Sequence, residues 1–256
     1  MSAYRTILFF GVFWGIMAHT MQAQSVLLVA NQNPGSLNTS DQAIKSRLES
    51  MGLTVFITGG PGTVPSASDA DGKSLVIISA SVYSTSINSI FRDVDVPVIC
   101  NEPWLFDDMK MTSYYENYHY GATSSRKRIR ILNSTHPIAV PYNYYVDVLS
   151  YYQEIGWGYP HSTADLIASV EGGGYSIFVY EEGEMMKSLY APAMRIGFFL
   201  GPNTAAYLNS TGWQIFENTV NYALSCTDVT DGGKIAGFES RCGGFNPAAI
   251  ISGVVA

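Results

Sequence analysis

Residues 74–81 read SLVIISAS, an apolar run that ends in small polar residues. A strand that is apolar at every position has both faces covered, as in a parallel sheet between two layers of helices. Three more short apolar runs lie nearby, at 25–31 (SVLLVAN), 53–59 (LTVFITG) and 96–100 (VPVIC). We expect these four runs to be neighbouring strands of one parallel sheet.

Helical patterns separate these runs. Residues 40–52 (SDQAIKSRLESMG) carry apolar residues at helical spacing, with Ser40 as the expected N-cap and Gly52 as the expected stop. Residues 85–93 predict a short second helix. Alternation of strands and helices is typical of a doubly wound α/β fold with a mainly parallel sheet.

The second half of the chain adds more strands and a final helix. Residues 211–224 (TGWQIFENTVNYAL) form the strongest helical pattern and should close the domain. We expect the following segments to be strands, several of them in hairpins added to the sheet: 126–133, 143–149, 164–170, 175–181 and 193–200.

Composition limits the classes of partner. The chain has 256 residues, 47% of them apolar and only 14% charged, with a net charge of −7. Nucleic acids and anionic membranes are bound by basic surfaces, so neither is an expected partner.

The two ends differ from the body of the chain. Residues 1–24 carry Arg5 and then about a dozen apolar residues, fewer than the roughly 20 needed to span a bilayer. This pattern predicts a secretory signal peptide, with an uncleaved anchor helix as the alternative. The protein is then secreted or at the cell surface, without a membrane segment after signal removal. We expect an α/β domain over 25–225 and, over 226–256, the start of a Gly-rich β module.

Three cysteines are present in a chain expected to be exported. Cys226 and Cys242 are close in sequence, and we expect them to form a disulfide. Cys100 would then be free, either as a small buried residue at the end of a strand or as a reactive thiol.

Ligands of doubly wound sheets bind at the carboxyl ends of the strands. The residues at these ends that we predict to bind a ligand are Asn31, Ser79, Ser81, Asn101 and Glu102.

Acidic residues are densest just after the fourth strand. Glu102 with Asp107 or Asp108 could act as acid and base on a glycosidic bond, or bind a hard cation. The alternative for the aspartates is a solvated pair at the start of a helical turn. His136 is a further catalytic candidate.

Glu181 follows another expected strand and is a further candidate for ligand binding. Alternatively, Glu181 forms a structural salt bridge with Arg195 across a hairpin.

Common cofactor motifs are missing from the sequence. It contains no Gly-x-Gly-x-x-Gly, no Walker A motif, no His-Glu-x-x-His and no Cys-x-x-Cys. We therefore predict no cofactor and no metal.

Tyrosines are concentrated between positions 114 and 152, around a long excursion at 102–125 without clear periodicity. Exposed tyrosines can stack on sugar rings, whereas ordinary packing and β-propensity are the alternative.

Several segments resemble a known family. Residues 94–112 (VDVPVICNEPWLFDDMKMT), 41–55 and 195–224 resemble segments of exported bacterial domains related to the class I glutamine amidotransferase fold and the trehalose-utilisation-protein group. The resemblance covers about 25–224 and implies a flavodoxin-like sheet with added β-hairpins. It also implies neighbouring β modules and a carbohydrate-rich extracellular setting.

The catalytic motif of the amidotransferases is not recognisable. Their nucleophile lies in Gly-x-Cys-x-Gly, whereas Ile99 and Asn101 flank Cys100 and no glycine is near. No His–Glu pair follows late in the chain. We therefore predict a non-catalytic binding or accessory module, with an extracellular glycan such as a polysaccharide as ligand. The alternatives are a glycan or amide hydrolase that uses Glu102 with Asp107 or Asp108, or Cys100, and a structural spacer.

Overall fold

The computed structural model describes residues 24–31, 36–60 and 63–225. The predicted signal peptide, apart from Gln24, lies outside these residues. The predicted C-terminal module lies outside them as well, together with Cys226 and Cys242, so their disulfide stays a prediction.

Eleven strands form one sheet in the described part of the chain. They are β1 (Ser25–Val29), β2 (Thr54–Thr58), β3 (Leu75–Ile78), β4 (Val98–Cys100), β5 (Tyr120–Arg126), β6 (Arg128–Ile131), β7 (Tyr145–Asp147), β8 (Gln153–Gly158), β9 (Asp165–Ser169), β10 (Tyr175–Tyr180) and β11 (Arg195–Phe198). The helices are α1 (Thr39–Ser50), α2 (Ser84–Ile87) and α3 (Ser210–Ser225), with 3₁₀ turns η1 (Ala67–Ala70), η2 (Pro103–Leu105) and η3 (Ala205–Tyr207).

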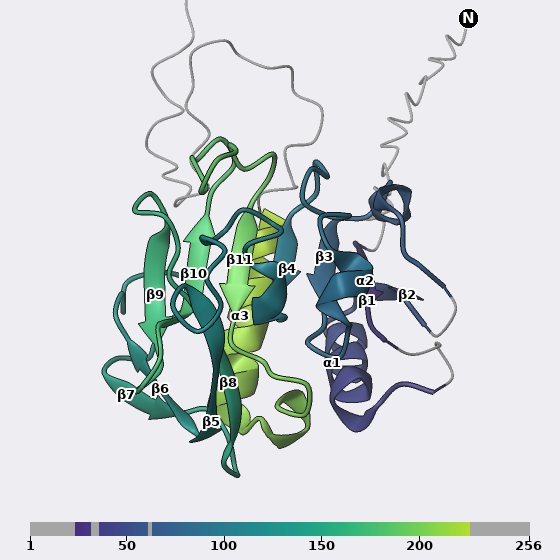
Figure 1. The fold of residues 1–256 in the computed structure, drawn as a ribbon. Coiled ribbons are helices and arrows are strands. Elements are labelled where there is room, and N and C mark those ends of the chain that lie inside the picture. Colours follow the sequence, from purple (N-terminus) through teal and green to yellow (C-terminus); the bar gives the residue numbers. More distant parts are fainter. Residues whose placement is uncertain (1–23, 32–35, 61–62, 226–256) are drawn as a thin grey trace, which may run out of the picture.

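The sheet is parallel in one half and antiparallel in the other (Figure 1). Its order is β2-β1-β3-β4-β11-β10-β9-β6-β7, and β5 and β8 pair with each other beside β10. The strands from β2 to β11 pair in parallel, whereas the pairs beyond β11 are antiparallel. The prediction of a mainly parallel sheet is therefore corrected to a mixed sheet, because the second half of the chain forms hairpins instead of helical crossovers.

Each face of the sheet has its own core. α1 and α3 cover one face, and α2 and η2 lie on the other (Figure 1). Within β3, Leu75 and Ile77 belong to the first core, and Val76 and Ile78 belong to the second. This explains the uninterrupted apolar run, since both faces of the strand exclude water. In the described part of the chain, no helix has the length and apolar character needed to cross a membrane.

Some boundaries differ from the prediction. The N-cap of α1 is Asn38, whose Oδ1 accepts a hydrogen bond from the Asp41 N–H at 2.8 Å, whereas Ser40 lies inside the first turn. Gly52 ends this helix region as expected, with a φ of +83° that favours glycine. α2 is only four residues long.

The sequence pattern gave no sign of β8 (QEIGWG). Two of its residues, Gly156 and Gly158, have low β-propensity. A Cβ at Gly158 would lie 3.0 Å from both Phe106 and Thr112. The glycines therefore allow β8 to lie close to η2 and the turn that follows it.

Candidate functional site

The carboxyl ends of β1 to β4 meet along one edge of the sheet, called the carboxyl edge here. Asn31, Gly59, Ser79 and Asn101 come just after these four strands. Because β2 and β3 lie on opposite sides of β1, the direction of winding reverses between β1 and β3. Open α/β sheets bind ligands outside the strand ends at such a reversal. This is the expected place for a ligand.

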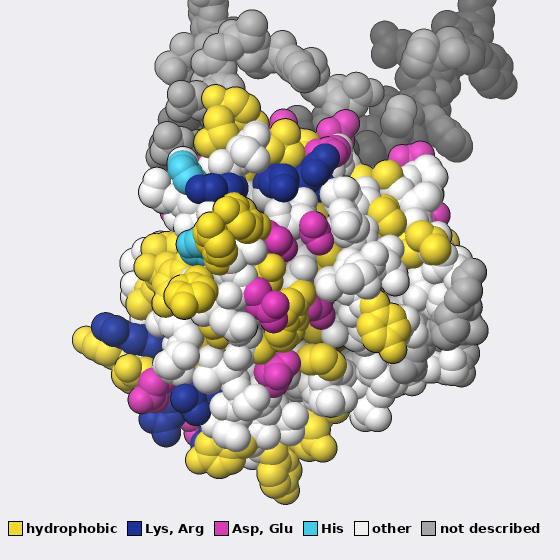
Figure 2. Space-filling view, in the orientation of Figure 1, with side chains coloured by type: hydrophobic (Ala, Val, Ile, Leu, Met, Phe, Trp, Pro, Cys, Tyr) yellow, Lys and Arg dark blue, Asp and Glu magenta, His cyan; other side chains and the backbone are white. Residues whose placement is uncertain are grey.

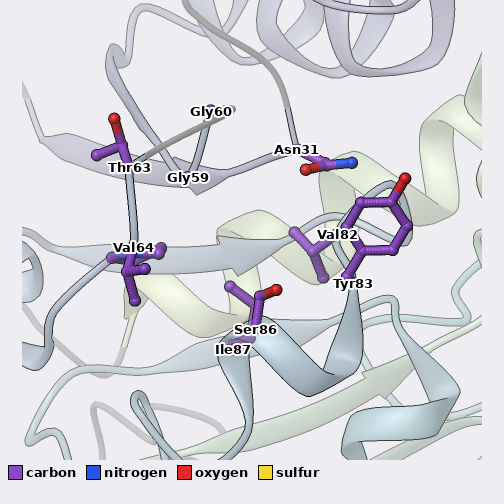
Figure 3. Close-up of a pocket in the computed structure, with 10 residues that line it drawn as sticks. Asn31, Gly59, Gly60, Thr63, Val64, Val82, Tyr83, Ser86 and Ile87 are labelled. Atoms are coloured by element: carbon purple, nitrogen blue, oxygen red, sulfur yellow. The ribbon is translucent and has the colours of Figure 1, made fainter.

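A pocket of about 450 Å³ lies at this place. Figure 3 shows the side chains of Asn31, Thr63, Tyr83 and Ser86 around one space. The lining residues are Asn31, Gly59, Gly60, Thr63, Val64, Pro65, Val82, Tyr83, Ser86 and Ile87. None of these lining residues is charged, and Tyr83 is 68% exposed. The pocket therefore offers amide and hydroxyl groups beside apolar surface and one accessible aromatic ring.

A buried carboxylate supports the wall of the pocket that Asn31 forms. Asp41, in the first turn of α1, is fully buried and accepts hydrogen bonds from the hydroxyls of Ser79 and Ser81. Ser81 Oγ also accepts a hydrogen bond from the Asn31 N–H at 3.2 Å. Burial raises the pKa of Asp41, and the two hydroxyls partly counter this effect. Ser81 thus joins the backbone of Asn31 to Asp41, and Ser79 bonds both to Asp41 and to the Ser81 N–H.

Glu102 and Asn101 follow β4 at the same edge. Glu102 is 5% exposed, and its Oε1 accepts a hydrogen bond from the Trp104 N–H at 3.2 Å. Burial first, and the charge of Glu154 in addition, raise the pKa of Glu102 to about 8. The Asn101 amide donates to the Ile78 carbonyl at 3.0 Å, and its Oδ1 has no partner among the described residues. Glu102 can therefore act as a neutral acid at pH 7, whereas Asn101 joins β4 to β3.

Cys100 is fully buried in the same core as Leu105 and Phe106. Its thiol donates to the Glu102 carbonyl at 3.4 Å, and burial raises its pKa. The thiolate is the nucleophilic form of cysteine. This environment disfavours the thiolate, so Cys100 is poorly suited to be a nucleophile.

Asp107 and Asp108 are half-buried at the end of the turn that begins with η2. They do not open a helical turn as the sequence predicted, because Glu102 is the N-cap of η2. Burial and the charge of Asp107 raise the pKa of Asp108, which also interacts with Lys110. No hydrogen bond or ion pair in the described residues joins either aspartate to Glu102.

Glu181 and His136 lie at the opposite, amino edge of the sheet. β10 is antiparallel to β11, and its last residue pairs with Arg195, the first residue of β11. Glu181 follows at that edge and accepts a hydrogen bond from the Tyr222 hydroxyl at 2.5 Å. The ring of His136 contacts Tyr222, with 4.7 Å between ring centroids. The structure therefore brings these two candidates together and separates them from Glu102.

Burial also affects the pKa values at the amino edge. It lowers the pKa of His136 and raises that of Glu181. His136 Nδ1 accepts a hydrogen bond from the Ile138 N–H at 3.2 Å. His136, Tyr222 and Glu181 therefore pack together, although His136 Nε2 and Glu181 Oε2 have no hydrogen-bond partner among the described residues.

The prediction of a salt bridge between Arg195 and Glu181 is wrong. The fully buried guanidinium of Arg195 donates instead to backbone carbonyls. Its partners are the carbonyls of Arg92, Val94, Val96, Ala193 and Met194, at 2.6–3.1 Å. Arg195 therefore holds the segment that leads into β4.

The tyrosine-rich region is largely exposed but lies outside the pocket. The rings of Tyr114 and Tyr115 contact each other at a tilt of 37°, with 4.2 Å between ring centroids, and Trp104 donates its indole N–H to Glu116 at 2.7 Å. The tyrosines more than half exposed between 114 and 152 are Tyr114, Tyr115, Tyr118, Tyr144, Tyr145, Tyr151 and Tyr152. The aromatic residue that lines the pocket is Tyr83.

Of the residues that line the pocket, the sequence predicted only Asn31 as a ligand-binding residue, and Asp41 and Glu154 were missed as well. Asp41 looked like an ordinary acidic residue near a helix N-terminus, and Tyr83 looked like an isolated aromatic in a loop. Glu154 lies on the unpredicted β8. The signal for this region was the set of polar residues at the strand ends, namely Asn31, Ser79, Ser81, Asn101 and Glu102.

No protein-family model matches the sequence, and no curated protein matches it. Similarity appears among solved structures. A ThuA-like protein from Bacteroides uniformis has a TM-score of 0.54 at 9% identity, over 84% of this chain and 97% of its own. A ThuA-like protein from Parabacteroides merdae has a TM-score of 0.53 at 12% identity, over 79% of this chain and 90% of its own.

A third structure, a cytoplasmic protein from Salmonella typhimurium, has a TM-score of 0.50 at 10% identity, over 77% of this chain and 98% of its own. At such low identity the likeness concerns the fold. The chain has an α/β fold similar to that of ThuA-like proteins.

Proposed function

We propose that this chain is a non-catalytic binding module and that its pocket takes a neutral, hydroxyl-rich ligand, namely a carbohydrate. The observation that carries this proposal is the lining of the pocket, which combines uncharged polar side chains, apolar side chains and one exposed aromatic ring. Such a lining matches the surface of a neutral sugar, with hydroxyl groups at its rim and C–H groups on its faces.

The individual contacts support this ligand class. Asn31 supplies an amide that can both donate and accept, and Thr63 and Ser86 supply hydroxyl groups. Tyr83 offers a ring face for the apolar side of a sugar. An anionic sugar is disfavoured, because the lining holds no cation and the whole chain has a net charge of −7.

The proposal is tested by screening the purified protein against neutral oligosaccharides and measuring the dissociation constant of each hit by calorimetry. Tyr83→Ala should weaken binding roughly 2- to 10-fold, since an aromatic contact contributes about 0.5–1.5 kcal/mol. Tyr118→Ala is the matched control, because Tyr118 is also exposed, at 78%, and lies outside the pocket. If no neutral sugar binds, or if both variants lose affinity equally, the proposal fails and the spacer role remains.

We further propose that the module is exported and lies beside β modules of the same chain. This rests on the signal-like segment 1–24 and the Gly-rich segment 226–256. Expression in a bacterial host and N-terminal sequencing of the mature protein provide the test. A cytoplasmic product that retains Met1 would contradict export.

Glycan or amide hydrolysis is the second candidate function, and Glu102 is the residue that favours it. A buried carboxyl group with a pKa of about 8 is protonated at pH 7 and can donate a proton to a leaving group. Asp107, Asp108 or Cys100 would be its partner in this hypothesis. Hydrolysis of a labelled oligosaccharide that is unchanged in Glu102→Gln would exclude it.

A further inference from the structure

The end of the sheet opposite the pocket carries a dense group of cations. Residues 126–130 (RKRIR) include four of the 14 Lys and Arg residues in the chain. They lie at the junction between β5 and β6, and β6 pairs with β7, the last strand in the sheet order. The pocket lies beside β1, β2 and β3, at the other end of that order. The cations and the pocket are therefore separate features.

Strand alternation places two of the arginines on the exposed side of β6. Ile129 and Ile131 belong to the core on the face that α1 and α3 cover. Arg128 and Arg130 alternate with them, so both point to the opposite side, where they are exposed. Tyr145 of β7 pairs with Arg130, and paired residues of antiparallel strands lie on the same side of the sheet. Arg130 therefore projects into solvent beside Tyr145, which is 55% exposed.

Neighbouring carboxylates neutralise only part of this positive charge. Asp147 of β7 lies 2.8 Å from the Lys127 ammonium and 3.6 Å from the Arg128 guanidinium. The side chain of Arg126 donates to the backbone carbonyls of residues 124, 125 and 171. Arg130 forms no ion pair or hydrogen bond through its side chain with the described residues. The guanidinium of Arg130 is therefore available to a partner.

Exposed tyrosine rings lie among these cations. Lys127 Nζ is 6.0 Å from the centre of the Tyr152 ring, which is 66% exposed. In Figure 2, Lys and Arg side chains gather beside hydrophobic side chains at the lower left, where Figure 1 places β6 and β7. Lys127, Arg128, Arg130, Tyr145 and Tyr152 are called the β6–β7 surface here.

We propose that the β6–β7 surface binds an acidic polysaccharide, namely a linear polymer of uronic acids. The planar guanidinium of arginine can form two parallel hydrogen bonds with a carboxylate. A rise of about 3.3 Å per residue places Arg128 and Arg130 roughly 7 Å apart along β6, so one extended chain with repeated carboxylates can reach both. The rings of Tyr145 and Tyr152 offer apolar faces to the sugar rings of the same chain.

A uronic acid polymer matches this surface better than other polyanions. It combines carboxylates for the arginines with rings for the tyrosines, whereas an acidic peptide has carboxylates but no ring to place on Tyr145 and Tyr152. Single-stranded nucleic acids also combine negative charge with flat rings. The choice of a glycan over a nucleic acid rests on the proposed function of an exported, carbohydrate-binding module, whereas the anion site rests on the exposed cations alone.

The test is calorimetry of the full chain with decagalacturonate and with its methyl-esterified form, which has the same rings without the charges. At about pH 7 and about 50 mM salt, the acidic form should bind at least about tenfold more tightly. Raising the salt to about 200 mM should weaken its binding at least about threefold, because salt screens exposed charges. Combining Arg128→Ala with Arg130→Ala should reduce its affinity about tenfold. Tyr145→Ala should reduce it roughly 2- to 10-fold.

Lys187→Ala is the matched control, since it removes one exposed cation between β10 and β11, outside the β6–β7 surface, and should leave the affinity unchanged. Urea unfolding of each variant verifies that it is folded. The anion site is overturned if decagalacturonate does not bind, if both forms bind equally well, or if the double arginine variant binds like the wild type.

Tighter binding of decaglutamate or of a decathymidylate than of decagalacturonate overturns the assignment to a glycan. Failure of the neutral-sugar pocket is recognised separately, because that pocket is tested with neutral oligosaccharides and Tyr83→Ala. Tyr83→Ala should leave the affinity for decagalacturonate unchanged, since Tyr83 lies at the other end of the sheet.

Discussion

Ser81 Oγ lies 2.6 Å from Asp41 Oδ2, and this hydrogen bond joins the end of β3 to the first turn of α1. Asp41 is the only acceptor of the Ser81 hydroxyl proton in the described structure, and it also accepts from Ser79. The hydrogen bonds hold together the two elements that flank the reversal of the sheet. Stability and pocket geometry are therefore coupled through one buried carboxylate.

Asp41→Ala should destabilise the protein by about 1–3 kcal/mol, because it leaves the buried Ser79 hydroxyl and the half-buried Ser81 hydroxyl without their acceptor. Urea unfolding at pH 7 measures the free energy of unfolding. Asp71→Ala removes an exposed aspartate and should change it by less than about 0.5 kcal/mol. Equal effects of the two substitutions would show that the Asp41 hydrogen bonds are energetically unimportant.

The stability of the protein should depend on the ionisation of Glu102. The folded state raises the pKa from 4.5 to about 8, so the folded protein binds the proton more tightly than the unfolded chain. The contribution of Glu102 to stability is then fully present below about pH 4.5 and is lost as the pH rises toward 8. Unfolding of the wild type and Glu102→Gln across this range should show the variant gaining relative stability with rising pH. If the difference in the free energy of unfolding between wild type and variant does not change with pH, the raised pKa is contradicted. Glu171→Gln, which removes an exposed carboxyl group from the turn between β9 and β10, is the control.

Cys100 should react with iodoacetamide at least about tenfold more slowly in the native protein than in urea, because its thiol is buried and its pKa is raised. Mass spectrometry of the peptide that contains Cys100 measures the rate separately from the other two cysteines. Rapid labelling of the native protein would reveal an accessible, activated thiol and would favour the nucleophile hypothesis.

Gly212→Ala should destabilise the protein by about 1–3 kcal/mol, although alanine is the better helix former. A Cβ at this position in α3 would lie 2.2 Å from the Val148 carbonyl oxygen. Asn221→Ala is the control, because Asn221 is exposed on the same helix and should be neutral or slightly stabilised. Thermal unfolding decides the result, and an increase in Tm for Gly212→Ala would show that the helix can shift away from Val148.

Local sequence patterns are sufficient to predict the strands and helix α1 in the parallel half of the sheet. Leu75–Ile78 is apolar at every position, and 40–51 has helical spacing, so the pattern indicates the strand and the helix without knowledge of their partners. The pattern of β8 is uninformative, because Gly156 and Gly158 are explained only by the close approach of η2. For the same reason the sequence did not predict that this strand pairs with β5 and β10.

The candidate site was partly predictable. Asn31, Ser79, Ser81 and Glu102 follow strands of one parallel sheet, so topology alone places them at one edge. His136 and Glu181 also follow strands in the predicted scheme, yet the antiparallel direction of β10 places them at the other edge. Strand direction depends on which strands pair, and single-sequence periodicity contains no information on pairing.

The α/β class and the polar strand ends can be recognised from the sequence alone, because these features depend on residues that are neighbours along the chain. The packing of distant segments sets the surroundings of the buried ionisable side chains. Asp41 accepts hydrogen bonds from two serines, Arg195 donates to backbone carbonyls, and the charge of Glu154 acts on Glu102. These groups are separated by some 40 to 100 residues in most of the pairs, and burial excludes the water that would otherwise solvate them. Long-range packing therefore sets the electrostatics of the site.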